Sequence, residues 1–327
     1  MLVNDQKTTL SRLIGHAKLL QSNASIPGND IPAMITSHER NALFQFAKEI
    51  YRYGCSDNSV IVDAGTFLGS SATALAAGLE LSPIPQNQQD GRIWCYDLFR
   101  ATPAMAAETG YGLGKKGIAA GESFRSLFDE YTRHITRKLN VFEGDIQEKP
   151  SPSQPISILF LDILWSTEVS QNVTRRFYPK LQQQRSILIH QDFIYPFYPW
   201  IPIHMGLMDK FFVPSLNVPH SSMVFDVIRP IQEQDVPDIR NVDFLEGKTQ
   251  LEKFINIQEG WGRGALLISL ALYAATKSKF DYAFKCMDEV TQRFSNEPLV
   301  AQYFSAANNF CKACAEAASP LELKGGA

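Results

Sequence analysis

The stretch Val60–Ala72 reads V-I-V-D-A-G-T-F-L-G-S-S-A. It opens with three β-branched apolar residues, which are typical of a buried strand. Asp63 stands where that strand would end, and Gly65 and Gly69 bracket a tight loop. The glycines allow the backbone to approach a ligand closely, and the Asp63 carboxylate can accept hydrogen bonds from polar groups of that ligand.

Behind the loop, the pattern predicts a helix that begins at Ala72. Ser70 and Ser71 are placed to cap this helix. A strand, a glycine loop and a helix N-terminus in this order are typical of a nucleotide-type ligand site in an α/β sheet. The alternative is a strand–helix turn that serves structure alone.

The composition is that of an ordinary globular protein, since 45% of the 327 residues are hydrophobic and 20% are charged. The formal net charge of −3 gives no reason to expect a nucleic acid or a membrane as a partner. Neither an apolar signal core nor a run of membrane-spanning length is found. The five cysteines are odd in number and form no dense framework, so a cytoplasmic location is expected.

Further apolar runs with strand character alternate with helical segments along the chain. Alternation of this kind predicts βαβ units and a mostly parallel sheet, with ligands at the carboxyl ends of the strands. An acid stands at or just past the end of each of five predicted strands. These acids are Asp63, Asp97, Asp145, Asp162 and Asp192. Acids collected on one edge of a sheet are a stronger signal than any one of them.

The predicted fold is a doubly wound, mostly parallel, Rossmann-like α/β sheet with helices on both faces and a C-terminal helical extension. We divide the chain into an N-terminal helical cover (1–33), the Rossmann-like domain (34–230) and the helical extension (231–327). Within the domain, we expect a helix from about His204 to Phe212. Met223–Arg229 is expected to form a late antiparallel strand at the sheet edge.

These residues resemble class I S-adenosylmethionine-dependent methyltransferases. The D-A-G-T-F-L-G-S-S loop is similar to the first motif of that family, which implies that Asp63, Gly65, Thr66, Gly69, Ser70 and Ser71 contact S-adenosylmethionine. Asp97 occupies the place of the acid that binds the ribose hydroxyls. Asp145 and Ile146 occupy the segment that flanks the adenine; Asp145 alone also fits a common turn.

A narrower resemblance, to the macrocin O-methyltransferase and cephalosporin-hydroxylase-like branch, rests on L-D-I-L-W-S-T-E-V, F-Y-P-K-L and I-L-I-H-Q-D-F. In that branch an acid after the fourth strand and an acidic pair after the fifth bind a divalent metal. The resemblance implies Asp162, Gln191 and Asp192 as ligands of Mg²⁺. The chain departs from the pattern because Gln191 replaces an acid. The alternative is that these side chains cap turns at the strand ends.

The sequence offers two candidates for catalysis, His190 and Asp162. A neutral histidine accepts a proton near pH 7, but His190 is equally well explained as a core residue. Neighbouring residues of a regular strand point to opposite faces, so His190 and Gln191 would not both face the site. The glycine-rich segment 110–121 fits either a lid over the substrate or a plain loop.

The leading hypothesis is a methyltransferase of secondary metabolism that methylates a hydroxyl of a small metabolite or sugar, with Mg²⁺ as an optional aid. The second is a catalytically degenerate protein of the same fold that serves as a binding or scaffold module. A third is a nicotinamide-dependent enzyme, which the missing third glycine of the dinucleotide fingerprint argues against. The expected partner is a small-molecule acceptor, and the apolar helical extension is compatible with a homodimer.

Overall fold

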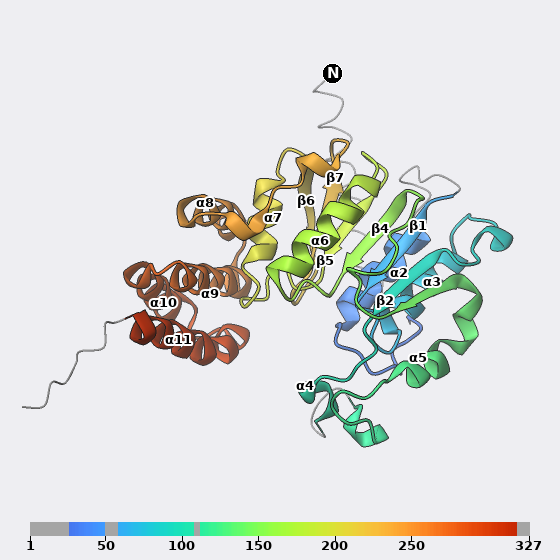
Figure 1. Cartoon of the computed structure of the whole chain (residues 1–327), viewed down its shortest axis with the longest axis horizontal. Coiled ribbons are helices and arrows are strands. Elements are labelled where there is room, and N and C mark those ends of the chain that lie inside the picture. The colour runs from blue at the N-terminus through green and yellow to red at the C-terminus, as the bar shows by residue number, and fades with distance from the viewer. Residues whose placement is uncertain (1–25, 50–57, 108–111, 319–327) are drawn as a thin grey trace, which may run out of the picture. The chain divides into compact units, whose positions relative to one another are not determined.

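The computed structural model describes residues 26–49, 58–107 and 112–318 (Figure 1). These residues form two compact units. The first comprises the described residues up to Gln191 together with Lys210–Val236; the second comprises Asp192–Asp209 and the described residues from Pro237 onward. Most of the predicted N-terminal cover, and residues 110 and 111 of the glycine-rich segment, lie outside the described residues.

The first unit is built on a seven-stranded sheet with the order β3-β2-β1-β4-β5-β7-β6 among the described residues. The first five strands in the sequence run parallel, whereas β7 is antiparallel to both β5 and β6. The strands are β1 (Val60–Ala64), β2 (Ile93–Asp97), β3 (Leu139–Glu143), β4 (Ile156–Leu161), β5 (Ile187–His190), β6 (Phe212–Asn217) and β7 (Met223–Val227). The predicted mostly parallel α/β sheet is thus confirmed.

The burial of the strands agrees with their positions in the sheet. Every residue of β1 and β4 is buried, as expected for central parallel strands covered on both faces. The strand β3 at one edge is only partly buried.

Two predictions about the end of the sheet are wrong. The strand at Met223–Val227 lies inside the sheet, between β5 and β6, and β6 is the edge strand. The helix expected at His204–Phe212 is α7, which ends at Leu207, and Phe212 begins β6. The strands β6 and β7 are consecutive in the chain and pair as an antiparallel hairpin, and the prediction fails because it assigns Phe212 to the end of a helix, which leaves no partner for β7 on its outer side.

Helices cover both faces of the sheet (Figure 1). Apolar residues of α2 and α3 share one buried cluster with Ile61 of β1 and Ile158 of β4. On the opposite face the ring of Phe177, at the end of α6, packs edge-on against Tyr96 of β2. The helices of this unit are α2 (Ser37–Lys48), α3 (Ser70–Glu80), α4 (Pro103–Ala106), α5 (Arg125–Thr132) and α6 (Thr167–Phe177).

The helix α2 begins with a capping box. The Thr36 side chain accepts from the Glu39 N–H, and the Glu39 carboxylate accepts from the Thr36 N–H at 2.7 Å. Glu39 is buried, and its second oxygen accepts a hydrogen bond from the Ser222 hydroxyl, next to the start of β7. One carboxylate therefore fixes the start of α2 and joins it to the sheet.

The second unit is helical. Its helices are α7 (Trp200–Leu207), α8 (Phe244–Ile255), α9 (Gly260–Thr276), α10 (Phe280–Phe294) and α11 (Pro298–Ala318). Helix α9 is buried along most of its length and packs against α8, α10 and α11. No helix among the described residues combines the length and apolar character that crossing a membrane requires.

The segment 192–209 groups with these helices, although the sequence placed it in the Rossmann-like domain. The ring of Phe193 packs edge-on against Phe254 of α8, with 4.8 Å between ring centroids. The Lys253 ammonium donates to the Gly206 carbonyl at 3.0 Å and to Asp209 at 2.6 Å. These contacts join segments far apart in the sequence. The predicted domain boundaries themselves stay predictions.

We expect Gly65→Ala to destabilise the protein strongly. A Cβ at Gly65 would lie 2.5 Å from the Asp162 carbonyl oxygen, and the backbone has a φ of +99°. Steric overlap with backbone adds to the strain of this φ, so the loss should be at least about 3 kcal/mol.

Gly117→Ala is the matched control, because Gly117 has a φ of +76° but nothing within 4 Å of the added Cβ. It should cost about 1 kcal/mol from backbone strain alone. Urea unfolding of both variants measures the difference. Equal losses would contradict the close approach of Gly65 to β4.

Candidate functional site

The candidate site lies at the carboxyl ends of β1, β2 and β4. Along the chain, β1 to β3 are added towards one side of the sheet, and β4 then pairs with the other side of β1. In open α/β sheets, such a reversal of strand order leaves a crevice outside the strand ends, where ligands bind. The predicted cofactor loop between β1 and α3 lies at this reversal.

The two glycines of the loop are required by close packing. The Gly65 N–H donates to the Tyr96 carbonyl and the Gly69 N–H donates to the Thr66 carbonyl, both at 2.8 Å. The φ angles of both glycines are positive, at 99° and 90°. A Cβ at Gly69 would overlap the Thr132 side chain at the end of α5. The loop is thus held against both β4 and α5.

The prediction that the two serines cap α3 is wrong. The N-cap is Gly69, without a side-chain hydrogen bond, and the helix begins at Ser70. The Ser70 hydroxyl donates to the Gly28 carbonyl at 3.3 Å, and the Ser71 hydroxyl donates to Asp63 Oδ2 at 2.8 Å. Both hydroxyls are therefore used to tie the first turn of α3 to its surroundings.

Asp63 is completely buried near the end of β1. Its Oδ1 atom accepts no hydrogen bond from any residue that the structure describes. Burial raises the pKa of this carboxyl from 3.8 to about 6; the hydroxyls of Ser71 and Thr66 partly offset the shift, and the charge of Asp97 adds to it. The site therefore contains a carboxylate that is poorly solvated when it is ionised.

Asp97 connects two loops at the end of β2. Its Oδ2 accepts from the Phe67 N–H at 2.9 Å, and its Oδ1 accepts from the Phe99 N–H at 2.7 Å. Burial raises the pKa of Asp97, and these two backbone bonds oppose the shift. Phe67 and Phe99 have positive φ angles of 48° and 50°. Such angles are strained for bulky residues and gather at functional sites.

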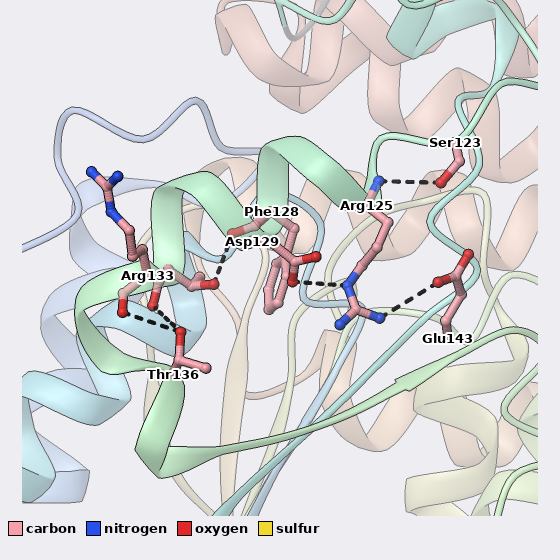
Figure 2. Close-up of polar contacts among 8 residues, drawn as sticks. Ser123, Arg125, Phe128, Asp129, Arg133, Thr136 and Glu143 are labelled. Atoms are coloured by element: carbon pink, nitrogen blue, oxygen red, sulfur yellow. Dashed lines mark hydrogen bonds and ion pairs between the residues drawn. The ribbon is translucent and has the colours of Figure 1, made fainter.

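An aromatic cluster supports these two loops from one side. The ring of Phe124 packs edge-on against Phe67 and Phe99, at centroid distances of 5.3 and 5.6 Å. The Arg125 guanidinium lies 5.2 Å from the Phe99 ring. It also lies 3.5 Å from Glu143 at the end of β3 (Figure 2). The sequence reasoning missed Arg125 and Glu143. An acid at the last residue of a strand was the available signal for Glu143.

Asp145 and Ile146 hold the turn after β3. The Asp145 carboxylate accepts from the backbone N–H of Gln147 at 2.9 Å and from its side-chain amide at 3.2 Å. The Arg176 guanidinium donates to the Ile146 carbonyl at 2.8 Å. These bonds agree with the turn alternative for Asp145, and its contact with a cofactor stays a prediction.

Two large apolar side chains are exposed directly after the strand ends. Leu98 follows Asp97 of β2 and is 46% exposed, and Trp165 follows β4 closely and is 43% exposed. Ligand sites commonly combine apolar walls with a few polar groups. Apolar surface beside the acids suits a ligand that has both a flat apolar part and polar groups.

His190 is buried within the first unit. Its Nε2 atom lies 2.9 Å from the Tyr178 hydroxyl, and its ring meets Phe225 of β7 edge-on. Burial raises the pKa of Tyr178 well above its ordinary value, so this hydroxyl stays protonated. The contacts agree with the core alternative for His190, and its role as a base stays a prediction.

The proposed metal ligands follow the ends of β4 and β5, and their role as ligands stays a prediction. Asp162 and Gln191 directly follow the paired residues Leu161 and His190 of β4 and β5. Gln191 is buried, and its Oε1 accepts no hydrogen bond from a described residue. Asp192 belongs to the second unit. No group of three or more His, Cys, Asp or Glu side chains suited to a metal occurs within 26–49, 58–107 and 112–318.

The chain matches no protein-family model and no curated protein sequence. Among solved structures, it is similar to CalS11, a TDP-rhamnose 3′-O-methyltransferase of calicheamicin biosynthesis, in its apo form. Identity is 21%, coverage is 68% of this chain and 93% of that chain, and the TM-score is 0.41. A second CalS11 structure gives 20% identity, coverage of 68% and 91%, and a TM-score of 0.42.

A third similar structure is a putative RNA methyltransferase, PH1948 from Pyrococcus horikoshii. Its identity is 13%, its coverage is 65% of this chain and 99% of that chain, and its TM-score is 0.36. The fold assignment rests on the strand order and direction of the sheet.

We expect Asp63→Asn to make stability less dependent on pH. The folded-state pKa of Asp63 is raised to about 6, so ionisation of its carboxyl costs stability as the pH rises from about 4 through about 6. Asparagine stays neutral and keeps an oxygen for Ser71. The variant should therefore gain on the order of 3 kcal/mol relative to the wild type between about pH 4 and pH 7.5.

Urea unfolding of both proteins at the two pH values measures this change. If the stability difference between variant and wild type is the same at both, Asp63 does not carry the raised pKa.

Proposed function

We propose that the chain is an S-adenosylmethionine-dependent methyltransferase that methylates a hydroxyl of a small metabolite or sugar. The observation that carries the proposal is the acidic character of the candidate site. Asp63 and Asp97 are both desolvated at the strand ends where the strand order reverses. S-adenosylmethionine carries a positively charged sulfonium and an ammonium group, which such a site favours.

The negative charge of the site argues against a dinucleotide cofactor. Dinucleotide sites place the pyrophosphate against the N-terminus of the first helix, where backbone N–H groups attract anions. Here Asp63 lies 2.8 Å from the Ser71 hydroxyl in the first turn of α3. A pyrophosphate at this helix end would meet a carboxylate nearby. The antiparallel β7 between β5 and β6 also departs from the all-parallel order of dinucleotide-binding sheets.

In this proposal the polar edge of the cofactor meets groups that are already oriented. Each oxygen of Asp97 accepts one backbone hydrogen bond and keeps a lone pair for a ribose hydroxyl. Leu98, exposed beside it, offers apolar surface to the flat adenine ring. The loop from Gly65 to Ser71 faces the amino-acid end, and the turn at Asp145 and Ile146 borders the adenine.

Methyl transfer from a sulfonium is an in-line displacement, so the protein mainly orients the acceptor and removes or masks its proton. Asp162, after β4, is our candidate for contact with the acceptor hydroxyl, and the exposed Trp165 would form an apolar wall.

We propose separately that a magnesium ion assists the methyl transfer. Asp162, Gln191 and Asp192 would hold the ion, which lowers the pKa of a hydroxyl acceptor when bound. The unsatisfied Gln191 Oε1 fits a hard cation, and the lack of a three-acid cluster among the described residues implies weak affinity.

A second candidate function is a protein that keeps the cofactor site and has lost turnover. The contact of His190 with Tyr178 favours it, because the Nε2 atom already has a hydrogen-bond partner and the ring is buried. In that case the helical second unit would supply a surface for partners or for a second copy of the chain.

We expect S-adenosylmethionine to bind the purified chain in calorimetry and NAD to leave no heat of binding. Asp97→Asn should weaken S-adenosylmethionine binding at least roughly tenfold, because an amide offers a ribose one acceptor oxygen in place of two. Asp288→Asn is a matched control, since Asp288 lies exposed on α10 in the second unit. Binding of NAD in place of S-adenosylmethionine would overturn the proposal.

Turnover separates the two functions. We expect release of S-adenosylhomocysteine with at least one member of a panel of hydroxylated sugars and metabolites, and a loss of at least about tenfold in Asp162→Asn. A chelator should lower the rate if magnesium assists. Cofactor binding without turnover on any acceptor would favour the second function, and an unchanged rate in chelator would remove magnesium from the proposal.

A further inference from the structure

A polar cavity lies at the opposite ends of the strands from the candidate site. Its volume is about 510 Å³, which falls in the range of small-molecule sites. One wall is the loop around the 3₁₀ turn Gln86–Gln88, which leads into β2; the other is the 3₁₀ turn Arg133–Lys138, which leads into β3. The cavity therefore lies near the amino ends of β2 and β3, away from Asp63 and Asp97.

Hydrogen bonds fix the two walls to each other. The Gly91 N–H donates to the Arg137 carbonyl at 2.8 Å, and the Asn140 side-chain amide donates to the Gly91 carbonyl at 2.6 Å. The Gln89 side-chain amide donates to the Ile84 carbonyl at 2.8 Å. A preformed site loses little conformational entropy when a ligand binds.

The cavity has an excess of positive charge. Two of its cations are paired, Arg137 with Asp90 at 2.9 Å and Lys138 with Glu80 at 3.5 Å. Arg133 makes no ion pair within the part of the chain that the structure describes. Figure 2 shows its side chain directed away from the polar contacts of α5. The Arg133 guanidinium is therefore available to an anion, for which its planar fork is well suited.

A buried acceptor belongs to Gln89, a residue that lines the same cavity. Gln89 is 1% exposed, and its Oε1 accepts no hydrogen bond from a described residue. A buried carbonyl oxygen without a donor is costly, so a ligand that donates here would remove that cost. A hydroxyl group supplies such a donor.

We propose that this cavity binds a phosphorylated, hydroxyl-bearing small molecule, with its phosphate at Arg133 and a hydroxyl at Gln89 Oε1. The exposed pair of Arg137 with Asp90 is weak enough to open, because the Arg137 side chain is 86% exposed, and Arg137 then joins the phosphate site. His134 lines the same wall and adds a further donor. The site is independent of the proposed methyl transfer, since it shares no residue with that site.

A neighbouring cavity of about 440 Å³ also borders Arg133 and His134. Its lining contains Asp30 and Glu130, which oppose an anion there. The larger cavity, where both acids are already paired with cations, is therefore the one that suits a phosphate.

Calorimetric titration of the full chain with glucose 6-phosphate, glycerol 3-phosphate, inorganic phosphate and glucose tests the site. We expect a sugar or glycerol phosphate to bind more tightly than inorganic phosphate, and glucose to show no binding. Arg133→Ala should weaken phosphate-ester binding at least roughly tenfold. Arg293→Ala is the matched control, because it removes an exposed arginine from α10 in the second unit.

Gln89→Met tests the second contact, because it removes the acceptor and keeps the length of the side chain. It should lower affinity for the phosphate esters and leave that for inorganic phosphate unchanged. If this buried variant does not fold, the comparison of the esters with inorganic phosphate decides the same point. The proposal is overturned if neither ester binds, if Arg133→Ala binds as well as the wild type, or if the esters bind no better than inorganic phosphate.

Discussion

The carboxylate of Asp97 is the contact on which the arrangement of the candidate site depends. It accepts one hydrogen bond from its own loop at Phe99 and one from the cofactor loop at Phe67. Both phenylalanines have left-handed backbone conformations, each of which costs about 1–2 kcal/mol. Hydrogen bonds to a charged group contribute roughly 1.5–3 kcal/mol each, enough to offset that strain. The loops keep their shape because the acid is there.

The sheet of the first unit has polar groups at both ends of its strands, and their charges are opposite in sign. At the carboxyl ends of the strands, Asp63 and Asp97 are desolvated by burial, which raises the pKa of both carboxyls. Near the amino ends of β2 and β3, Arg133, which makes no ion pair with a described residue, lines the same cavity as Gln89. One sheet thus supports a cation-favouring site and an anion-favouring site at opposite ends of its strands, so that a ligand at either end has little electrostatic reason to occupy the other.

The sheet could be predicted because apolar runs and strand-end acids are local signals, as in Ile156–Asp162. What the local pattern does not show depends on partners distant in the chain. Ser70 looks like a cap but bonds the Gly28 carbonyl, and the segment 192–209 looks continuous with β5 but packs through Phe193 on Phe254. The strand at Met223–Val227 is a different case: it is internal because its near neighbour β6 pairs with it, and the pattern at Phe212 indicates the end of a helix although Phe212 begins β6.

The length of one side chain sets the distance between two loops. Asp97 reaches the Phe67 and Phe99 amides at the same time, at 2.9 and 2.7 Å. A glutamate would carry the same charge on a stem one methylene longer, and it would have to fold back or push the loops apart. Charge can therefore be retained at this position while the geometry is lost, so a chain with this pair of loops is restricted to aspartate by size.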